Sequence, residues 1–496
     1  MMRNVIIGSG PAAAGAALAL CADPAQRVTV VDIGGRLSGP NQAALGRLAA
    51  ADRSQWSPED VATITEQPAR AASGKIPQKR AYGSDFAFRD STVWGAQAMP
   101  FSRSTFDTWP VSWADIEPHY RAVLAEVPLA GEEDDYAAAF PLLAARSALP
   151  PLAARTREVL ERYARHRDAI RRRGVIVGKA RLAFDAARCV RCGLCMTGCP
   201  YSLIYSSGHT FDRLIRAGRV RYLSDILVTG VSEDPRPAVT GVHLRTGAQV
   251  TLDADRVFIG AGAIGSTRIV LSSLQNPPDR VPLRESMQFL VPFLSRRTTG
   301  DPRRTPAQDF TLNQFNLLIQ FDDRAFTTSQ IHCYPYNPAV AGALPAILGA
   351  RTADRLAGAL LGRLTAGLGY LPSWASPRHE LVLERDRRQR LAEVRVRPVS
   401  SASPMLRQVL TRLARVGPKL DLLPMLPMVA VSGPAKSYHV GSTFPHGSGS
   451  DLLGRVGPWR AVHLIDGAVL PSVPATTFML TVMANAHRIA TEALRG

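Results

Sequence analysis

Residues 4–20 read NVIIGSGPAAAGAALAL and residues 28–32 read VTVVD, and these two stretches decide the fold. The first predicts a strand, a glycine-containing turn and a helix, and the second predicts another strand of the same unit. Gly8 and Gly10 would let the backbone approach a pyrophosphate at the helix N-terminus, where free N–H groups and the helix dipole favour anions. The chain is therefore predicted to open with a βαβ unit of the dinucleotide-binding type.

An acidic residue, Asp32, closes the second predicted strand. A carboxylate at this place can accept hydrogen bonds from the ribose hydroxyls of a nucleotide, and it disfavours the 2'-phosphate of NADP. It does not by itself distinguish FAD from NAD, and a plain tight turn is the alternative interpretation of the glycines. The predicted nucleotide-binding residues of this unit are Gly8, Gly10, Ala13, Gly15 and Asp32.

The composition is typical of a soluble enzyme with two connected domains, because 46% of the 496 residues are hydrophobic and 20% are charged. The formal net charge is +18, but the arginines are scattered without interleaved aromatic residues, which argues against nucleic acid. A basic surface would instead suit an acidic redox partner. The predicted first strand begins almost at Met1, so we expect no signal peptide and a cytoplasmic location. No apolar run is long enough to predict a transmembrane helix.

Four of the six cysteines fall in CVRCGLCMTGCP, residues 189–200. Their spacing, C-x2-C-x2-C-x3-C-P, is that of bacterial ferredoxins and predicts an iron–sulfur cluster, in the first place 4Fe-4S. Zinc is the main rival, but its sites usually combine two separated C-x-x-C pairs. Three alternatives for the fourth ligand stay open: Cys199, the remote Cys333, or none, as in a 3Fe-4S cluster. The predicted ligands are Cys189, Cys192, Cys195 and Cys199.

The C-terminal part carries SYHVGST at residues 437–443, LIDGAVLPSVP at 464–474 and a predicted helix over 477–490. Together with residues 94–120 and 260–271, about a third of the chain resembles the glucose-methanol-choline (GMC) oxidoreductases. The resemblance implies an α/β, two-domain fold in which a Rossmann-like FAD-binding domain joins an antiparallel-sheet substrate domain, as in p-hydroxybenzoate hydroxylase. It also implies FAD contacts from Trp94, Val228, Gly262, Asp466, Gly467 and Phe478.

The same resemblance assigns the catalytic residues. In that family a histidine at the position of His439 acts as general base toward a substrate hydroxyl while hydride passes to the flavin. Imidazole suits this task because its ordinary pKa lies near neutrality. The family's second catalytic residue, usually His or Asn, corresponds to Thr477, and a threonine cannot act as a base at ordinary pH. His439 would then act alone or together with His446, which lies in the same loop.

The resemblance and the apolar pattern together predict the domain organisation. Residues 338–372 are rich in Ala, Leu and Gly and are expected to form buried or lid-like helices, with contact to a membrane or a lipid-like substrate as the alternative. The predicted parts are FAD-binding residues 1–125, 205–275 and 433–496, an insertion with the iron–sulfur loop at 126–204, and a substrate-binding domain at 276–432.

A flavin takes up two electrons as hydride, whereas a cluster passes electrons on one at a time. The sequence therefore predicts a dehydrogenase that oxidises an alcohol, such as a sugar or glycoside hydroxyl, to a carbonyl. Its electrons would leave to an acidic ferredoxin, a cytochrome or a quinone. The cysteine run also resembles the iron–sulfur insertion of FAD-dependent sugar dehydrogenases. The alternative hypotheses are an isomerase or lyase without net redox change, and an electron-transfer or binding protein with a degenerate site.

Overall fold

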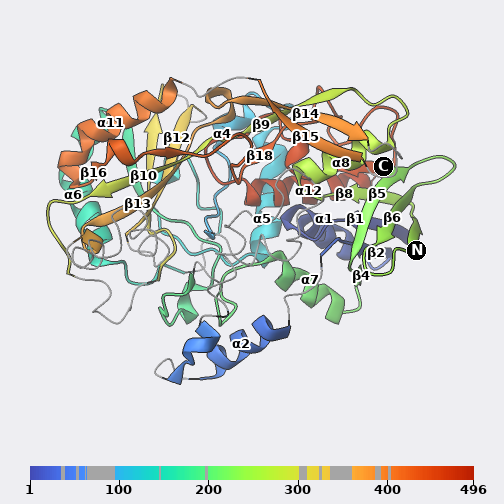
Figure 1. The fold of residues 1–496 in the computed structure, drawn as a ribbon, viewed down its shortest axis with the longest axis horizontal. Coiled ribbons are helices and arrows are strands. Elements are labelled where there is room, and N and C mark those ends of the chain that lie inside the picture. Colours follow the sequence, from blue (N-terminus) through green and yellow to red (C-terminus); the bar gives the residue numbers. More distant parts are fainter. Residues whose placement is uncertain are drawn as a thin grey trace.

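The structure is a computed structural model of the 496-residue chain. Two domains lie side by side along the long axis of the molecule, and helix α2 (Gly39–Ala50) projects from the lower edge (Figure 1). The described residues are 1–34, 39–51, 55–61, 63, 95–144, 147–195, 199–300, 310–322, 327–335, 360–385, 392–399 and 404–495.

A five-stranded parallel sheet forms the centre of the first domain, with the strand order β19-β8-β1-β2-β4. Both faces of this sheet are buried, which explains the continuous apolar run at the start of the chain. In β1, Ile6 points into one core while Val5 and Ile7 point into the other. The strands are β1 (Met2–Ile7), β2 (Gln26–Val31), β4 (Val220–Leu223), β8 (Arg256–Ile259) and β19 (Val462–Leu464).

Helices cover one face of this sheet, and a helix with a small sheet covers the other. The first layer contains α1 (Pro11–Cys21), α5 (Trp113–Glu126), α7 (Ser207–Arg216) and α12 (Met479–Ala493). The second layer contains α8 (Ala263–Ser273) and the antiparallel strands β5 (Ile226–Ser232), β6 (Ala238–His243) and β7 (Gln249–Asp253). This is the layered arrangement of a nucleotide-binding α/β domain.

The second domain contains a seven-stranded antiparallel sheet with the order β16-β10-β13-β12-β11-β3, and β17 also pairs with β10. Its apolar face is covered by α6 (Ala154–Arg171) and α11 (Met405–Leu420). The strands are β3 (Val175–Lys179), β10 (Gln288–Leu294), β11 (Phe315–Gln320), β12 (Thr328–Tyr334), β13 (Leu364–Tyr370), β16 (Leu423–Pro424) and β17 (Ala430–Val431).

The other face of this sheet is mixed and lies toward the first domain. Near the edge strand β3 it is apolar, because Ile176 and Leu318 pack there in a small hydrophobic cluster. Around the middle of β12 it carries polar side chains: Gln330 and His332 share this face, while Ile331 and Cys333 pack into the apolar core on the other side. Asn316 of β11 stands beside His332 in the register, and these residues form the polar face of β12.

A four-stranded sheet, β15-β14-β9-β18, continues from one domain to the other. Its strands are β9 (Arg280–Glu285), β14 (Arg378–Arg385), β15 (Ala392–Pro398) and β18 (Val440–Gly441). Short helical elements complete the described chain, namely α4 (Arg103–Phe106), η2 (Asp135–Ala138), η3 (Ala186–Arg188), η5 (Ser373–Ala375), η6 (Leu426–Met428) and η7 (Gly467–Val469).

Two segments differ from the predicted organisation. Residues 126–204, expected as an insertion, also supply α6 and the edge strand β3 of the second domain. Most of the predicted helical stretch 338–372 lies outside the described residues, but Leu364–Tyr370 forms strand β13 in the middle of the sheet, so a helix there was wrong. Among the described residues, no helix has the length and hydropathy needed to cross a membrane.

Candidate functional site

The first glycine turn has the shape of an anion-binding loop. Gly8 has φ +100°, and a Cβ there would lie 2.3 Å from the carbonyl oxygen of Gly260, so two turns cross closely at this point. Gly10 caps α1, and a Cβ on it would meet nothing within 4 Å. The N-terminus of α1 therefore faces open space beside Gly10, which suits a pyrophosphate.

Ala13 and Gly15 serve packing instead. Ala13 is completely buried in the core between the sheet and its helices. A Cβ on Gly15 would lie 2.1 Å from the carbonyl oxygen of Met483, because α1 and α12 cross there. The prediction that Gly15 contacts the cofactor was therefore wrong: the position needs glycine so that two helix backbones can meet.

Asp32 lies directly after β2 and is buried. Its carboxylate accepts a hydrogen bond from the Gly34 N–H at 2.7 Å. Burial raises its pKa to about 6, against the opposing effect of the hydrogen bonds from the neighbouring backbone and Ser9. A carboxylate at this place can accept further hydrogen bonds from the two hydroxyls of a ribose.

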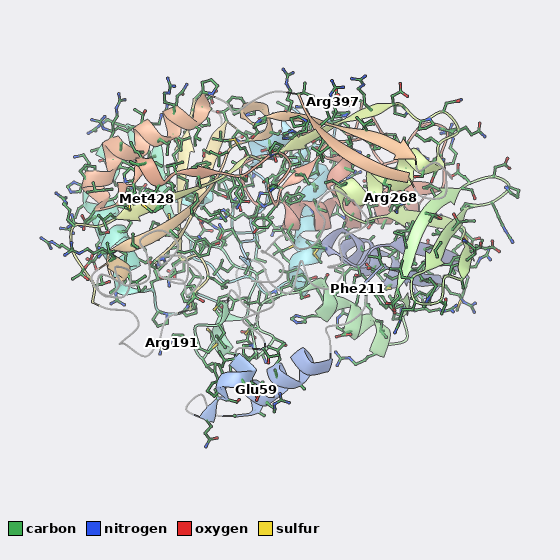
Figure 2. All side chains as sticks on the ribbon, viewed as in Figure 1. Glu59, Arg191, Phe211, Arg268, Arg397 and Met428 are labelled. Atoms are coloured by element: carbon green, nitrogen blue, oxygen red, sulfur yellow. The ribbon has the colours of Figure 1, made fainter. Side chains whose placement is uncertain are left out.

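The second turn joins β8 to α8 and repeats this geometry. Gly262 has φ +79°, caps α8 and borders open space. Asp466 accepts hydrogen bonds from Ser266 Oγ at 2.5 Å and from the Ala468 N–H at 2.9 Å, and burial raises its pKa to about 6. The carbonyl of Val228 in β5 accepts a hydrogen bond from Arg268, which Figure 2 labels on α8.

These residues fit a bound dinucleotide such as FAD. Two glycine-capped helix N-termini face space that no side chain fills, and a buried carboxylate stands at the end of the second strand. A flavin bound there would lie near the segment that contains His439, because β18 and η7 are in contact. Trp94, the remaining predicted contact, lies outside the described residues.

His439 is enclosed by two aromatic rings at the junction of the domains. Its imidazole stacks on Tyr370 with the ring centroids 4.7 Å apart, and Phe478 meets it edge-on at 5.0 Å. Its Nδ1 is buried without a hydrogen-bond partner, and burial lowers its pKa to about 3. The imidazole is therefore neutral at neutral pH and able to accept a proton.

The backbone around His439 is fixed by neighbouring serines. The Ser286 N–H donates to the His439 carbonyl at 2.9 Å, and the His439 N–H donates to Ser437 Oγ at 3.2 Å. Ser437 Oγ in turn donates to the Ser286 carbonyl. The loop before β18 is thus tied to the turn after β9, which positions the imidazole.

Thr477 lies beside the same aromatic enclosure. It directly precedes Phe478, whose ring would be 3.0 Å from a Cβ on Gly467. The hydroxyl oxygens of Thr476 and Thr477 are both buried without a hydrogen-bond partner. The absence of a side chain at Gly467 therefore leaves space for the ring of Phe478. The two threonine hydroxyls can form hydrogen bonds with a ligand, but they cannot act as a base.

His446 does not act with His439. Its Nδ1 donates to the Asp451 carbonyl at 2.7 Å, and its Nε2 accepts from Asn485 Nδ2 at 3.1 Å. Burial is the first cause that lowers its pKa to about 4. Because both ring nitrogens are engaged, the prediction of a catalytic His446 was wrong, and the residue ties its loop to α12.

A second histidine, His332, was missed by sequence reasoning. It lies on the polar face of β12, its ring is 5.2 Å from Tyr370, and its Nε2 is 2.9 Å from Gln330 Oε1. Burial lowers its pKa to about 3, with a further contribution from the nearby His439. The alternation of polar and apolar residues in β12 is the sequence pattern that could have placed His332 on the polar face.

The four predicted cysteine ligands lie in one loop next to a small core that includes Leu182 and Phe310. Burial is the main cause that raises the pKa of Cys189 to about 11 and of Cys192 to about 12, and neighbouring thiols add to both shifts. The thiols are therefore close to one another. Metal coordination would deprotonate them.

Backbone N–H groups point at two of the sulfur atoms. Thr311 donates from its N–H to Cys195 Sγ at 3.4 Å and from its hydroxyl to the Gly193 carbonyl at 3.0 Å. The Arg191 N–H donates to Cys189 Sγ at 3.4 Å. Such bonds stabilise thiolate charge and are typical of iron–sulfur sites.

The structure bears on the choice of the fourth cluster ligand. Within the described part of the chain, no group of three His, Cys, Asp or Glu side chains is arranged around a point where one metal ion could be held. Cys333 is fully buried in the core under α6 and α11, apart from the cysteine loop. This placement favours Cys199 over Cys333 as the fourth ligand.

Comparison with known proteins agrees with this description. Residues 182–204 match the family model described as a 4Fe-4S binding domain. The whole structure is similar to the crystal structure of pyridoxine 4-oxidase from Mesorbium loti, with a TM-score of 0.63, 13% sequence identity and 100% of each chain covered. No curated protein matches the sequence. The predicted α/β fold, in which a nucleotide-binding domain joins an antiparallel-sheet domain, is confirmed, and its cysteine loop matches a 4Fe-4S binding domain.

Proposed function

We propose that this protein is a flavin-dependent oxidoreductase of the GMC type that oxidises a CH–OH group and releases its electrons through an iron–sulfur cluster. The observation that carries the proposal is the neutral, buried His439, which lies between Tyr370 of one domain and Phe478 of the other. The glycine turns supply the dinucleotide site, and the cysteine loop supplies the cluster site.

Oxidation of a CH–OH group requires a proton acceptor and a site from which water is excluded. A bound flavin would supply the hydride acceptor. His439 takes the hydroxyl proton of the substrate as the C–H bond breaks, so that the C–O bond becomes a carbonyl. The rings of Tyr370 and Phe478 exclude water, and this desolvation keeps the imidazole in its neutral, proton-accepting form.

The polar face of β12 supports a hydroxylated substrate, such as a sugar or a glycoside. Gln330, His332 and Asn316 lie together on this face, where amide and imidazole groups can exchange hydrogen bonds with several hydroxyls. The structural neighbour is an oxidase named for pyridoxine. The cysteine loop favours a dehydrogenase here, because a cluster gives the electrons a route to a ferredoxin, a cytochrome or a quinone.

Anaerobic mixing of the flavin- and iron-loaded protein with candidate alcohols tests the proposal. Flavin bleaching followed by reduction of the cluster, seen in the visible and EPR spectra, is the expected result. His439→Asn should slow bleaching by roughly 10² to 10⁴-fold, the usual contribution of a general base. His166→Asn, the same change at an exposed histidine of α6, serves as the control. Bleaching at an unchanged rate in His439→Asn would refute the assignment of the base.

A second candidate function is an isomerase or lyase that uses the flavin without net redox change. It is favoured by one observation, the threonine at position 477, where the GMC oxidoreductases usually have a second catalytic His or Asn. The same experiment decides between the two: product formation without bleaching supports the isomerase or lyase, and bleaching in proportion to product supports the dehydrogenase.

A further inference from the structure

The cysteine loop has one side that is open to solvent. Ala187, Arg188 and Val190 are exposed next to the predicted ligand Cys189. Val190 is 53% exposed and is therefore an apolar residue on the surface. The predicted ligand Cys189 is thus directly followed in the chain by an accessible apolar side chain.

Described residues pack against other parts of the loop. Leu312 and Phe310 pack with Cys195 and Cys199 in the small core of the cluster region. Thr311 adds its two hydrogen bonds to Cys195 and Gly193. On a further side, Leu194 packs against the small cluster of Ala44 and Leu48 in α2. Among the described residues of the loop, Ala187, Arg188 and Val190 are the exposed ones.

Positive charge surrounds Val190. The Arg188 side chain is 70% exposed, and its Nε is paired with Asp185. Arg191 makes no ion pair with a described residue, and Figure 2 shows it at the lower edge of the main body. Its backbone has φ +54°, so that its N–H reaches Cys189 Sγ. Two arginine side chains thus flank Val190, on a chain whose net charge is +18.

We propose that residues 187–191 form the docking surface for a small acidic protein with a one-electron centre, such as a ferredoxin. This inference rests on the proposed function. In the encounter, one electron passes from the reduced cluster to the partner's centre, the cluster is oxidised and the partner is reduced, and no bond or proton is exchanged. A small apolar contact ringed by charges is typical of transient electron-transfer complexes, which bury little surface.

Stopped-flow mixing of the iron-loaded enzyme with a chemically reduced acidic ferredoxin measures this encounter without the alcohol substrate. The readout is the second-order rate constant of cluster reduction at low and high ionic strength. Arg191→Glu should lower that rate constant about tenfold at low salt, and about 0.3 M salt should remove most of the difference, because screening shortens the reach of charge. The backbone N–H at 191 is retained in this variant, so the Cys189 hydrogen bond stays.

Two further variants make the result specific. Arg407→Glu makes the same charge change on α11, in the other domain, and should leave the rate constant near that of the unmodified protein. Val190→Ser should lower it at both ionic strengths, since the apolar contact does not depend on salt. A small uncharged reductant should reduce the cluster at the same rate in all proteins.

The outcomes distinguish a failure of the docking surface from a failure of the proposed function. If Arg191→Glu and Arg407→Glu lower the rate constant equally, only the total charge of the protein matters. If Arg191→Glu does not lower the rate constant at low salt, the partner docks elsewhere. Either result overturns the proposed docking surface. A purified protein that takes up no iron and sulfide overturns the proposed function itself, and this is seen from metal analysis before any kinetic measurement.

Discussion

The imidazole of His439 stacks on the phenol ring of Tyr370, with ring centroids 4.7 Å apart and an angle of 27° between the planes. Tyr370 ends strand β13 of the second domain, whereas His439 precedes β18 and the segment that returns to the first domain. The proposed base is therefore enclosed by residues from both domains, and its protonation depends on their contact.

The pH dependence of flavin reduction should reveal this enclosure. Because burial lowers the pKa of His439 to about 3, its neutral, proton-accepting form persists far below the ordinary imidazole pKa of about 6.5. The bleaching rate should therefore stay level from pH 8 down to about pH 5. Tyr370→Ala admits water, raises the pKa toward the ordinary value and should move the acidic decline upward. Stopped-flow absorbance across this range measures both, and a decline near pH 6.5 in the unmodified protein would contradict the enclosure.

Alanine substitutions at Gly10, the cap of α1, and at Gly15, inside α1, should affect different properties of the protein. Gly15→Ala places a methyl group 2.1 Å from the Met483 carbonyl, so it should destabilise the fold by about 1–3 kcal/mol, typical of overpacking. Gly10→Ala meets no protein atom within 4 Å, so it should leave the unfolding free energy nearly unchanged while weakening FAD binding at least about tenfold. Urea unfolding of the apoprotein and flavin titration measure the two effects. Loss of stability in Gly10→Ala would show that its open space is not the cofactor site.

The features of the fold that were predicted correctly from the sequence are local. The strand, glycine turn and helix at the start of the chain and the cysteine run each depend on residues close together in the chain, where backbone geometry and ligand spacing follow directly from residue type. Gly15 shows the limit of such motifs. Glycine is required at this position because the backbone contacts α12, a helix that lies hundreds of positions later in the chain. From the sequence alone, this packing requirement looks the same as a glycine that lets a phosphate approach the backbone.

Residues that depend on long-range pairing were missed or misassigned. His332 joins the site because the register of β12 places it beside Asn316 on the polar face, and a shift of one residue would bury it under α6 and α11. His446 was assigned a catalytic role because it lies near His439 in sequence. Its hydrogen bond to Asn485 of α12 could not be predicted from the loop alone.

The structural role of His446 predicts a specific acid sensitivity. Its folded pKa of about 4 lies below the ordinary value of about 6.5, so the unfolded chain binds a proton that the folded chain does not. Its contribution to stability is therefore full above pH 6.5 and is lost as the pH falls toward 4. Between pH 7 and 4.5 this single group should cost roughly 2 kcal/mol.

His446→Gln tests this by removing the titrating group. The variant should be less stable at pH 7, because the bonds to Asp451 and Asn485 are disturbed, but its unfolding free energy should fall less steeply toward pH 4.5. Flavin bleaching by substrate should survive in the folded variant. A loss of bleaching comparable to that of His439→Asn, without a change in the pH slope of stability, would restore His446 as a catalytic residue.

The hydrogen bond from Thr311 to Cys195 should set the reduction potential of the cluster. An N–H aimed at a ligand sulfur stabilises the additional negative charge of the reduced cluster, so removing it should make reduction harder.

Thr311→Pro lacks the N–H and should lower the reduction potential by on the order of tens of millivolts, given that 59 mV is a tenfold change in the equilibrium constant for one electron. Thr311→Val keeps the N–H and loses the hydroxyl, which bonds to the Gly193 carbonyl and also interacts with Cys195, so its shift should be smaller. EPR-monitored redox titration measures the potentials, and iron content confirms that the cluster is intact. If Thr311→Pro retains its iron and has the same potential as Thr311→Val, the N–H does not tune the cluster, and the contact of this segment with the cysteine loop is only mechanical.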